Sequence, residues 1–156
     1  MLLNPANENS GTRLLEKLQR ARALTPDLMS EIIAAACPRL ALLPSSGKAA
    51  ARIAQLFACS AWAEVGLALI EIELPGWSLR RLAYDDGEWH STLSRQPNLP
   101  AEIDDTADSH HEALPLAILS AFLEAQDSRF ARKTASAAVP QVRSAPAHTV
   151  CCDNFA

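Results

Sequence analysis

The sequence predicts an α+β protein that is mainly helical, with about five helices packed with one antiparallel β-hairpin. Three observations support this prediction. Apolar residues recur with the helical period in several segments between residues 12 and 126. A single Asp86-Gly87 pair separates two short alternating segments, which is typical of a tight hairpin turn. The 156 residues are 49% hydrophobic and 21% charged, as expected for one globular domain.

Two helices are expected in the first forty residues. Thr12 can cap the first, whose apolar side comprises Leu14, Leu15, Leu18 and Ala21. Its other positions form a basic face of Arg13, Lys17, Arg20 and Arg22. The second should begin at Thr25-Pro26-Asp27, because the hydroxyl, the proline and the carboxylate each suit the first turn of a helix. Pro38 should end it.

Two more helices are expected between residues 45 and 74. The third should begin at Ser45 or Ser46, since the residues that follow keep the helical period: Ala49, Ile53, Leu56, Phe57 and Ser60. Residues 62–74 fit two patterns. Trp62, Val65, Leu69 and Ile72 fit a helix, whereas Ile70, Ile72 and Leu74 alternate with glutamates as in a strand. We predict a helix.

Residues 77–94 should form the hairpin. Pairing outward from the turn places Tyr84 opposite Trp89, Leu82 opposite Ser91 and Arg80 opposite Leu93. Strand alternation then gives a side that we assign to the core, consisting of Leu82, Tyr84, Trp89 and Leu93. The other side faces outward, with Trp77 at its rim, and comprises Leu79, Arg81, Ala83 and His90.

The last core element should be a helix over residues 114–126 that begins at Pro115, where proline fits the first turn. Beyond Asp127 the sequence is rich in Ala, Ser and Pro and loses its periodicity, which predicts disorder. We therefore divide the chain into a flexible N-terminus (1–11), a single globular α+β domain (12–126) and a disordered tail (127–156).

The net charge of −4 argues against a protein that coats nucleic acid, because neutralising phosphates needs a clustered excess of Lys and Arg. The first residues do not resemble a secretion signal. No uncharged apolar run approaches the roughly 20 residues of a membrane span. We therefore expect a cytoplasmic protein with reduced cysteines. Cys37 and Cys59 lie on apolar helix faces and should be buried.

Residues 104–112 concentrate acidic and imidazole side chains. Residues 104–108 match the D-D-x-x-D pattern that holds magnesium in some enzymes, and His110-His111-Glu112 follows. The second acidic motif of those enzymes is missing, and adjacent histidines on a helix point roughly 100° apart. We predict no metal and no cofactor here, and interpret the segment as a solvated acidic loop and a polar helix start. The alternative is a small enzyme or metal-binding protein that uses this cluster.

Two stretches carry a resemblance. Residues 74–90 (LPGWSLRRLAYDDGEWH) and 114–125 (LPLAILSAFLEA) resemble a group of small uncharacterised proteins from nitrogen-fixing soil bacteria. Together they cover about a fifth of the chain. The resemblance implies no assigned activity, and it transfers no functional residue to this sequence.

The sequence favours a non-enzymatic protein-interaction or regulatory module, because helix faces and the Trp-containing hairpin are its distinctive features. Trp77, Arg81 and His90 are the predicted partner-binding residues, since Trp and Arg are enriched at binding hot spots. The expected partner is another protein, rather than a membrane or a nucleic acid. Two alternatives stay open: the tryptophans complete the core, or the basic first helix binds nucleic acid weakly.

Overall fold

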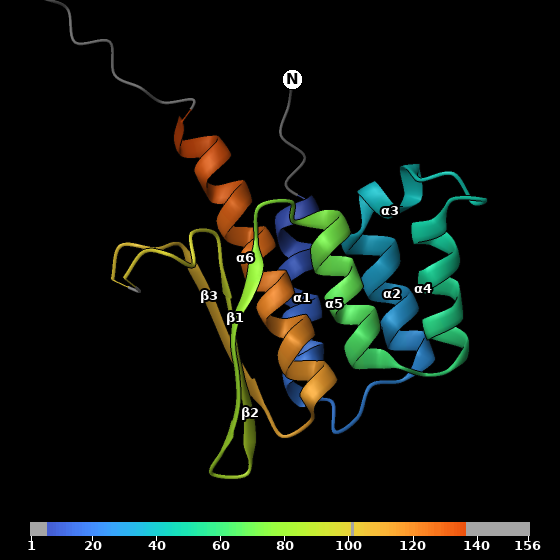
Figure 1. Ribbon diagram of the computed structural model, residues 1–156, viewed down its shortest axis with the longest axis horizontal. Coiled ribbons are helices and arrows are strands. Elements are labelled where there is room, and N and C mark those ends of the chain that lie inside the picture. The colour runs from blue at the N-terminus through green and yellow to red at the C-terminus, as the bar shows by residue number, and fades with distance from the viewer. Residues whose placement is uncertain (1–5, 101, 137–156) are drawn as a thin grey trace, which may run out of the picture.

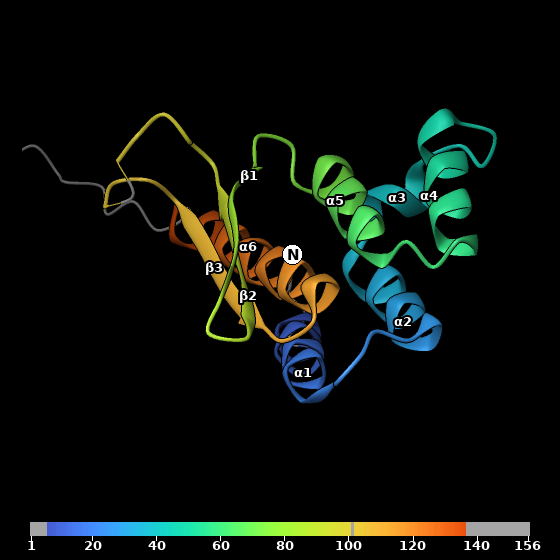
Figure 2. The same cartoon turned by 60° about the horizontal axis from the view of Figure 1, so that its bottom comes forward.

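The computed structural model describes residues 6–100 and 102–136 and confirms the predicted α+β class. The described residues form six helices and a three-stranded antiparallel sheet in the order β1-β2-β3. The elements are α1 (Ala6–Arg20), α2 (Pro26–Ala36), α3 (Pro38–Leu42), α4 (Lys48–Ala58), α5 (Trp62–Glu73), β1 (Ser78–Asp85), β2 (Glu88–Ser94), β3 (Thr106–His111) and α6 (Leu114–Ser136). Helix α6 separates the sheet from α2, α3, α4 and α5 (Figures 1 and 2).

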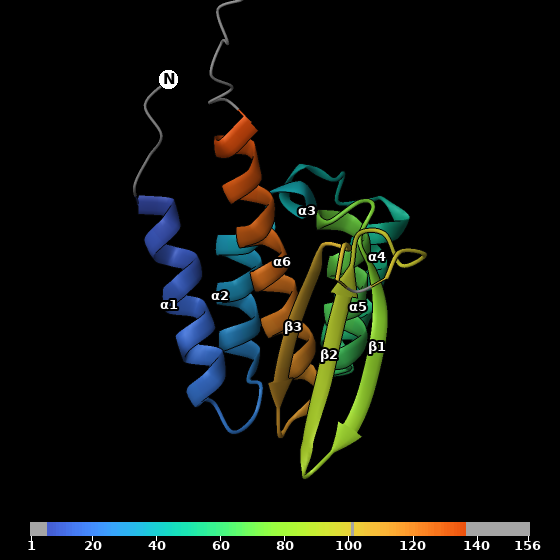
Figure 3. The same ribbon diagram turned by 90° about the vertical axis from the view of Figure 1, so that its left-hand side faces the viewer.

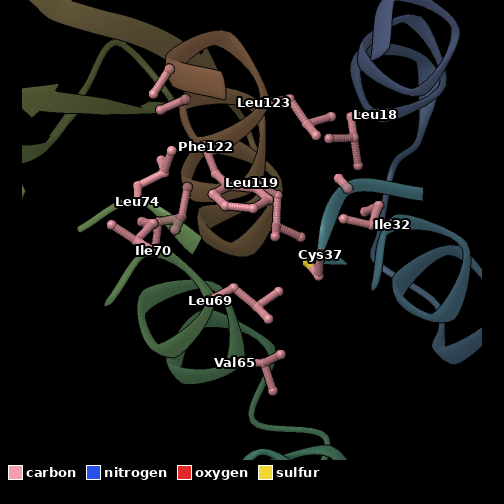
Figure 4. Close-up of a cluster of buried hydrophobic side chains, with 14 of the residues drawn as sticks. Leu18, Ile32, Cys37, Val65, Leu69, Ile70, Leu74, Leu119, Phe122 and Leu123 are labelled. Atoms are coloured by element: carbon pink, nitrogen blue, oxygen red, sulfur yellow. The ribbon is translucent and has the colours of Figure 1, made fainter. Parts of the chain in front are cut away.

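Helix α6 is buried on every side over its first turns, since every residue from Leu116 to Leu123 is buried. A helix that is buried all round needs neighbours in every direction. Helix α6 packs against β2, β3, α1 and α5, and Figure 3 shows it between α1 and the sheet. In the core, Phe122 lies toward Leu74 and Leu123 lies toward Leu18 (Figure 4).

Helix α6 is longer than predicted, because it continues past Gln126 to Ser136. Two side chains tie this extension to neighbouring helices. Gln126 Nε2 donates to the carbonyl of Ala36 (2.7 Å), and Arg129 Nη1 donates to the carbonyl of Glu73 (2.9 Å). The tail predicted from residue 127 therefore begins as helix. Residues 137–156 of that predicted tail lie outside the described residues.

The other predicted helices are present, but two of their starts differ. Helix α4 begins at Lys48 with Gly47 as its N-cap, so the predicted start at Ser45 or Ser46 is wrong, and Thr12 lies within α1, so its predicted role as the cap is wrong. Helix α2 begins at Pro26, and Thr25 Oγ1 accepts a hydrogen bond from the Leu28 amide (3.2 Å) as the N-cap. The ambiguous segment 62–74 is the helix α5. Helix α1 begins at Ala6, so part of the N-terminus predicted as flexible (1–11) is helical. The short helix α3 was not predicted.

Helix α3 depends on a glutamate from a distant part of the chain. The carboxylate of Glu73 accepts hydrogen bonds from the amides of Arg39 (3.2 Å) and Leu40 (2.7 Å), which are otherwise unpaired at the N-terminus of a helix. Burial and then the nearby Glu73 charge raise the pKa of the Cys37 thiol to about 12. Cys37 is buried as predicted, but Cys59 is exposed, because it follows the last turn of α4.

The predicted hairpin turn is confirmed. Asp86 and Gly87 have φ angles of 49° and 88°, and both are positive as a two-residue turn requires. Tyr84 pairs with Trp89 as predicted, and their rings lie 5.2 Å apart.

The far end of the hairpin differs from the prediction. A β-bulge between Leu79 and Arg81 places Leu79 opposite Leu93, so the predicted pairing of Arg80 with Leu93 is wrong. A bulge adds one residue to a strand and leaves it unpaired. Arg80 is that residue, and its side chain turns to Asp104 instead.

A third strand occupies part of the segment predicted as a loop and a helix start. Strand β3 pairs antiparallel with β2, from His111 opposite Trp89 to Thr106 opposite Ser94. The predicted polar helix start at residues 109–112 is therefore wrong. Only Ala107 is buried in β3, so the alternation of apolar and polar residues that indicates a strand is missing from its sequence.

The sheet reaches the core at Leu93 and Ala107, which are buried. Leu79, opposite Leu93, also packs half-buried against the core, so its predicted outward orientation is wrong. The register places Leu82 and Tyr84 on the same side as Leu93, as predicted. These two side chains are nevertheless 37% and 61% exposed, so their predicted burial is wrong. Helix α6 covers β2 and β3, whereas β1 and the turn extend past the helices (Figure 1).

We predict that Gly87→Val destabilises the fold by about 1 kcal/mol or more, because a β-branched residue resists the positive φ of this turn. Gly87→Asn is the matched control, since asparagine tolerates the left-handed region far better. Urea denaturation of both variants provides the measurement. Equal stability of the Val variant and the wild type would contradict the role assigned to the turn.

Candidate functional site

The predicted partner-binding residues do not all share one surface. Arg81 and His90 lie on the side of the sheet that faces away from α6, where Arg81 pairs with Thr92 and His90 pairs with Ala83. Arg81 is exposed and His90 is half-buried. Trp77 precedes β1 and packs, half-buried, against the core. Arg81 and His90 thus form part of an outer face, whereas much of the Trp77 ring serves packing.

Strand β1 has an open edge, because no strand of the described chain pairs with its outer side. The residues that flank a two-residue turn exchange hydrogen bonds, and the pairs alternate from there along the strands. Asp85 flanks the turn, so the backbone groups of Tyr84 and Leu82 point away from β2. The exposed apolar residues of the hairpin therefore coincide with its unpaired backbone groups.

Asp104, the first residue of the acidic cluster, is a structural anchor. Its side chain is fully buried, which corrects the predicted solvated loop at this residue. It accepts hydrogen bonds from Arg80 Nη1 (2.8 Å), the Gln96 amide (2.9 Å) and the Ser94 hydroxyl. Desolvation raises the pKa of Asp104, but the three hydrogen bonds and the Arg80 charge outweigh it, and the pKa lies below its ordinary value. The residue therefore fixes the loop after β2 to the bulge.

The two adjacent histidines have separate surroundings. Neighbouring residues of a strand point to opposite faces. His110 lies on the outer face and stacks on His90 with 5.8 Å between the ring centres. His111 Nδ1 accepts a hydrogen bond from the Ala113 amide (3.0 Å) just before α6. Among the described residues, no three His, Cys, Asp or Glu side chains gather closely enough to hold a metal ion.

A pocket opens between the end of α1, the edge strand β3 and α6. Its volume is about 590 Å³. The lining residues come from four separate segments and are Gln19, Arg20, Ala21, Arg22, Glu88, Asp108, Ser109, His110, His111, Glu112 and Glu124. A volume of this size is typical of small-molecule sites. The second half of the predicted acidic and imidazole cluster thus lines a cavity, whereas its first half is used to hold a loop.

Glu124 is the pocket residue that the sequence interpretation missed. Burial raises the pKa of its carboxyl, and repulsion by Asp108 and Asp127 raises it further, while His110 lowers it. A carboxyl with a raised pKa in a cavity is a candidate functional group. Small residues one and two turns earlier, at Ser120 and Ala117, allow α6 to approach the sheet closely and bring Glu124 beside β3.

Comparisons of the chain with family models, curated proteins and solved structures found no match. The resemblance to proteins of nitrogen-fixing soil bacteria therefore stays a prediction. Of the helices in the described residues, none has both the length and the apolar character needed to cross a membrane. Two surfaces of the described residues are candidates for binding, the open edge of β1 and the pocket beside β3.

We predict that Glu124→Gln is at least as stable as the wild type at neutral pH. Because the pKa of Glu124 is higher in the folded protein than in the unfolded chain, the folded state holds the proton more tightly. Ionisation of Glu124 therefore lowers the stability of the wild type as the pH rises through the pKa of this carboxyl in the unfolded chain and then in the folded protein. The advantage of the Gln variant should disappear below about pH 4, where both states are protonated.

Urea denaturation at a series of pH values measures this difference. Glu71→Gln is the control, because Glu71 is an exposed glutamate on α5 away from the pocket. A wild type that is more stable than Glu124→Gln at neutral pH would show that the Glu124 carboxylate is stabilised rather than strained.

Proposed function

We propose that the protein is a non-enzymatic interaction module whose partner, another protein, adds a strand to the open edge of β1. The observation that supports this proposal most is that exposed side chains and unpaired backbone groups occur together at Leu82 and Tyr84. Both side chains are exposed, and both residues direct unpaired backbone groups to the same edge. Addition of a strand to a sheet edge is a common mode of peptide recognition, in which backbone hydrogen bonds give affinity and side chains give specificity.

The position of the edge supports the same proposal. A long exposed edge strand is a template for pairing with another chain, and proteins usually blunt it. The bulge at Arg80 blunts the first part of β1, but Arg81 to Asp85 pair regularly with β2. The turn end of the hairpin projects beyond the helices, which leaves this end of the β1 edge accessible to a partner (Figure 1).

Side chains on both faces of this edge can provide specificity. The partner strand would contact Leu82 and Tyr84 on the face toward α6 and Arg81 on the outer face. Tyrosine and arginine are among the residues enriched at binding hot spots. Arg81 would thereby have the role predicted for it. His90 lies one strand further in, on the same outer face, and Trp77 contributes by packing beside the start of β1.

The enzyme or metal-binding alternative has weaker support in the cluster at 104–112. Asp104 accepts a hydrogen bond from the Gln96 amide in the loop after β2. His111 accepts one from the Ala113 amide at the start of α6. The residues that do line a cavity lie on the far edge of the sheet from β1.

We predict that Leu82→Pro abolishes capture of the partner, whereas Leu82→Ala weakens it only in part. Both variants lose the leucine side chain, but only proline also removes the outward backbone donor. Proline is tolerated on an edge strand where its nitrogen faces away from the ladder, so the two variants should agree in stability within about 1 kcal/mol. Affinity capture with mass spectrometry, paired with thermal denaturation, provides the measurement. Equal capture by the Ala and Pro variants would exclude strand addition at β1.

A second pair of substitutions tests the outer face. Arg81→Glu with His90→Glu should abolish capture while the stability stays within about 0.5 kcal/mol of the wild type, as is usual for surface changes. Light scattering on the purified protein identifies the case in which the partner is a second copy of this chain. Unaltered capture by this double variant would remove the outer face from the binding surface.

A further inference from the structure

The pocket beside β3 lies at the opposite edge of the sheet from the proposed partner surface. It combines groups from the end of α1, the last residues of β3 and the third turn of α6. It is an open depression in the surface, and several of its charged lining residues are exposed. Its lining consists mainly of polar and charged side chains, which favours a polar ligand over an apolar one.

The charges in the pocket are divided between its walls. Arg20 and Arg22 come from the end of α1, and Arg20 has only a distant contact with Glu16 (3.8 Å). Four carboxylates come from the sheet side and α6, namely Glu88, Asp108, Glu112 and Glu124. The structure therefore presents cationic groups on one wall and anionic groups on the other.

The anionic wall is not neutralised by the protein. In the described residues, no Lys or Arg side chain forms a salt bridge with any of its four carboxylates. Both carboxylate oxygens of Asp108 accept hydrogen bonds, from the hydroxyls of Thr92 and Thr106. Asp108 and Asp127 repel Glu124, and His110 partly offsets this repulsion. An ammonium group placed beside Glu124 would relieve this repulsion, because opposite charges at short range favour the ionised carboxylate.

The opposite wall suits an anion. Arginine presents several N–H donors in a plane and binds carboxylates with two parallel hydrogen bonds. Arg22 is exposed at the entrance to the pocket and has no salt bridge to a described residue. A metal ion would satisfy neither wall well, because the acidic groups are spread along the pocket instead of converging on one point.

We propose that this pocket binds a small zwitterionic molecule, with an ammonium group against Glu124 and a carboxylate against Arg22. The ligand class is that of amino acids and related amino carboxylates. The two charges of such a molecule pair with the two walls of the pocket. The volume of the molecule is well within the 590 Å³ of the pocket. This proposal is independent of the strand addition at β1, which involves other residues and the other edge.

The test uses the full-length protein and 6-aminohexanoate as the probe, with hexylamine and hexanoate as matched molecules that carry one charge each. Binding is followed by amide chemical shifts in two-dimensional NMR spectra. We expect saturable shifts at residues 19–22 and 108–112, and affinity for 6-aminohexanoate at least tenfold higher than for either single-charge molecule.

Two substitutions assign the binding to the walls. Glu124→Gln and Arg22→Gln should each weaken binding of 6-aminohexanoate about tenfold. Glu71→Gln, outside the pocket, should leave binding unchanged. Thermal denaturation of each variant checks that the fold is intact. If Glu124→Gln captures the protein partner as well as the wild type does, the ligand site is separate from the edge of β1.

Three results would overturn the proposal. The first is the absence of saturable shifts up to about 10 mM probe, since a specific site for this class should be occupied by then. The second is binding of hexylamine or hexanoate as tight as that of 6-aminohexanoate, which would remove the need for two opposed walls. The third is unchanged binding in both Glu124→Gln and Arg22→Gln, which would place the probe elsewhere.

Discussion

The complete burial of α6 is the constraint on which the rest of the fold depends. Each turn from Leu116 to Leu123 has side chains pointing in every direction, and all of them are buried. Neighbours are therefore needed on every side, and the sheet, α1 and α5 supply them. Leaving such a helix partly uncovered would expose several large apolar side chains, each costing about 1.5–3 kcal/mol when exposed. The arrangement of the other elements follows from this requirement.

The width of a single helix also explains the shape of the sheet. Helix α6 packs against β2 and β3, with small residues on the sheet side. Strand β1 lies outside the covered strip, so its residues near the turn face water on both sides of the sheet. The same helix thus determines both the buried part of the sheet and the open edge proposed to bind a partner.

Sequence patterns identified those elements whose signal is local. The cap at Thr25 and the turn at Asp86-Gly87 are each encoded within a few residues, and both are confirmed. Strand β3 could not be found in this way, because it has polar residues on both faces and its strand character comes from pairing with β2. The bulge at Arg80 likewise depends on a distant carboxylate, that of Asp104.

The pocket could not be predicted from the sequence for a related reason. Its walls come from segments near residues 20, 110 and 124, which meet only after α6 has packed on the sheet. The sequence pattern singled out residues 104–112, but it did not distinguish the structural role of Asp104 from the position of Asp108 at the pocket. The difference lies in their surroundings, since Asp104 is buried among three donors, whereas Asp108 is exposed at the pocket and accepts hydrogen bonds from two threonine hydroxyls of the sheet.

The features that cost stability gather where α6 meets β2 and β3. Glu124 has a raised pKa there. The buried hydroxyls of Ser91 and Ser120, from β2 and α6, have no hydrogen-bond partner in the described residues. Elsewhere the buried polar groups are satisfied, as Glu73 is by two amides at the start of α3. Departures from full polar satisfaction in an otherwise consistent fold are expected at functional sites. Of these groups only Glu124 lines the pocket, so the unpaired serines are a feature of the packing of α6 on the sheet, whereas the strained carboxyl belongs to the proposed ligand site.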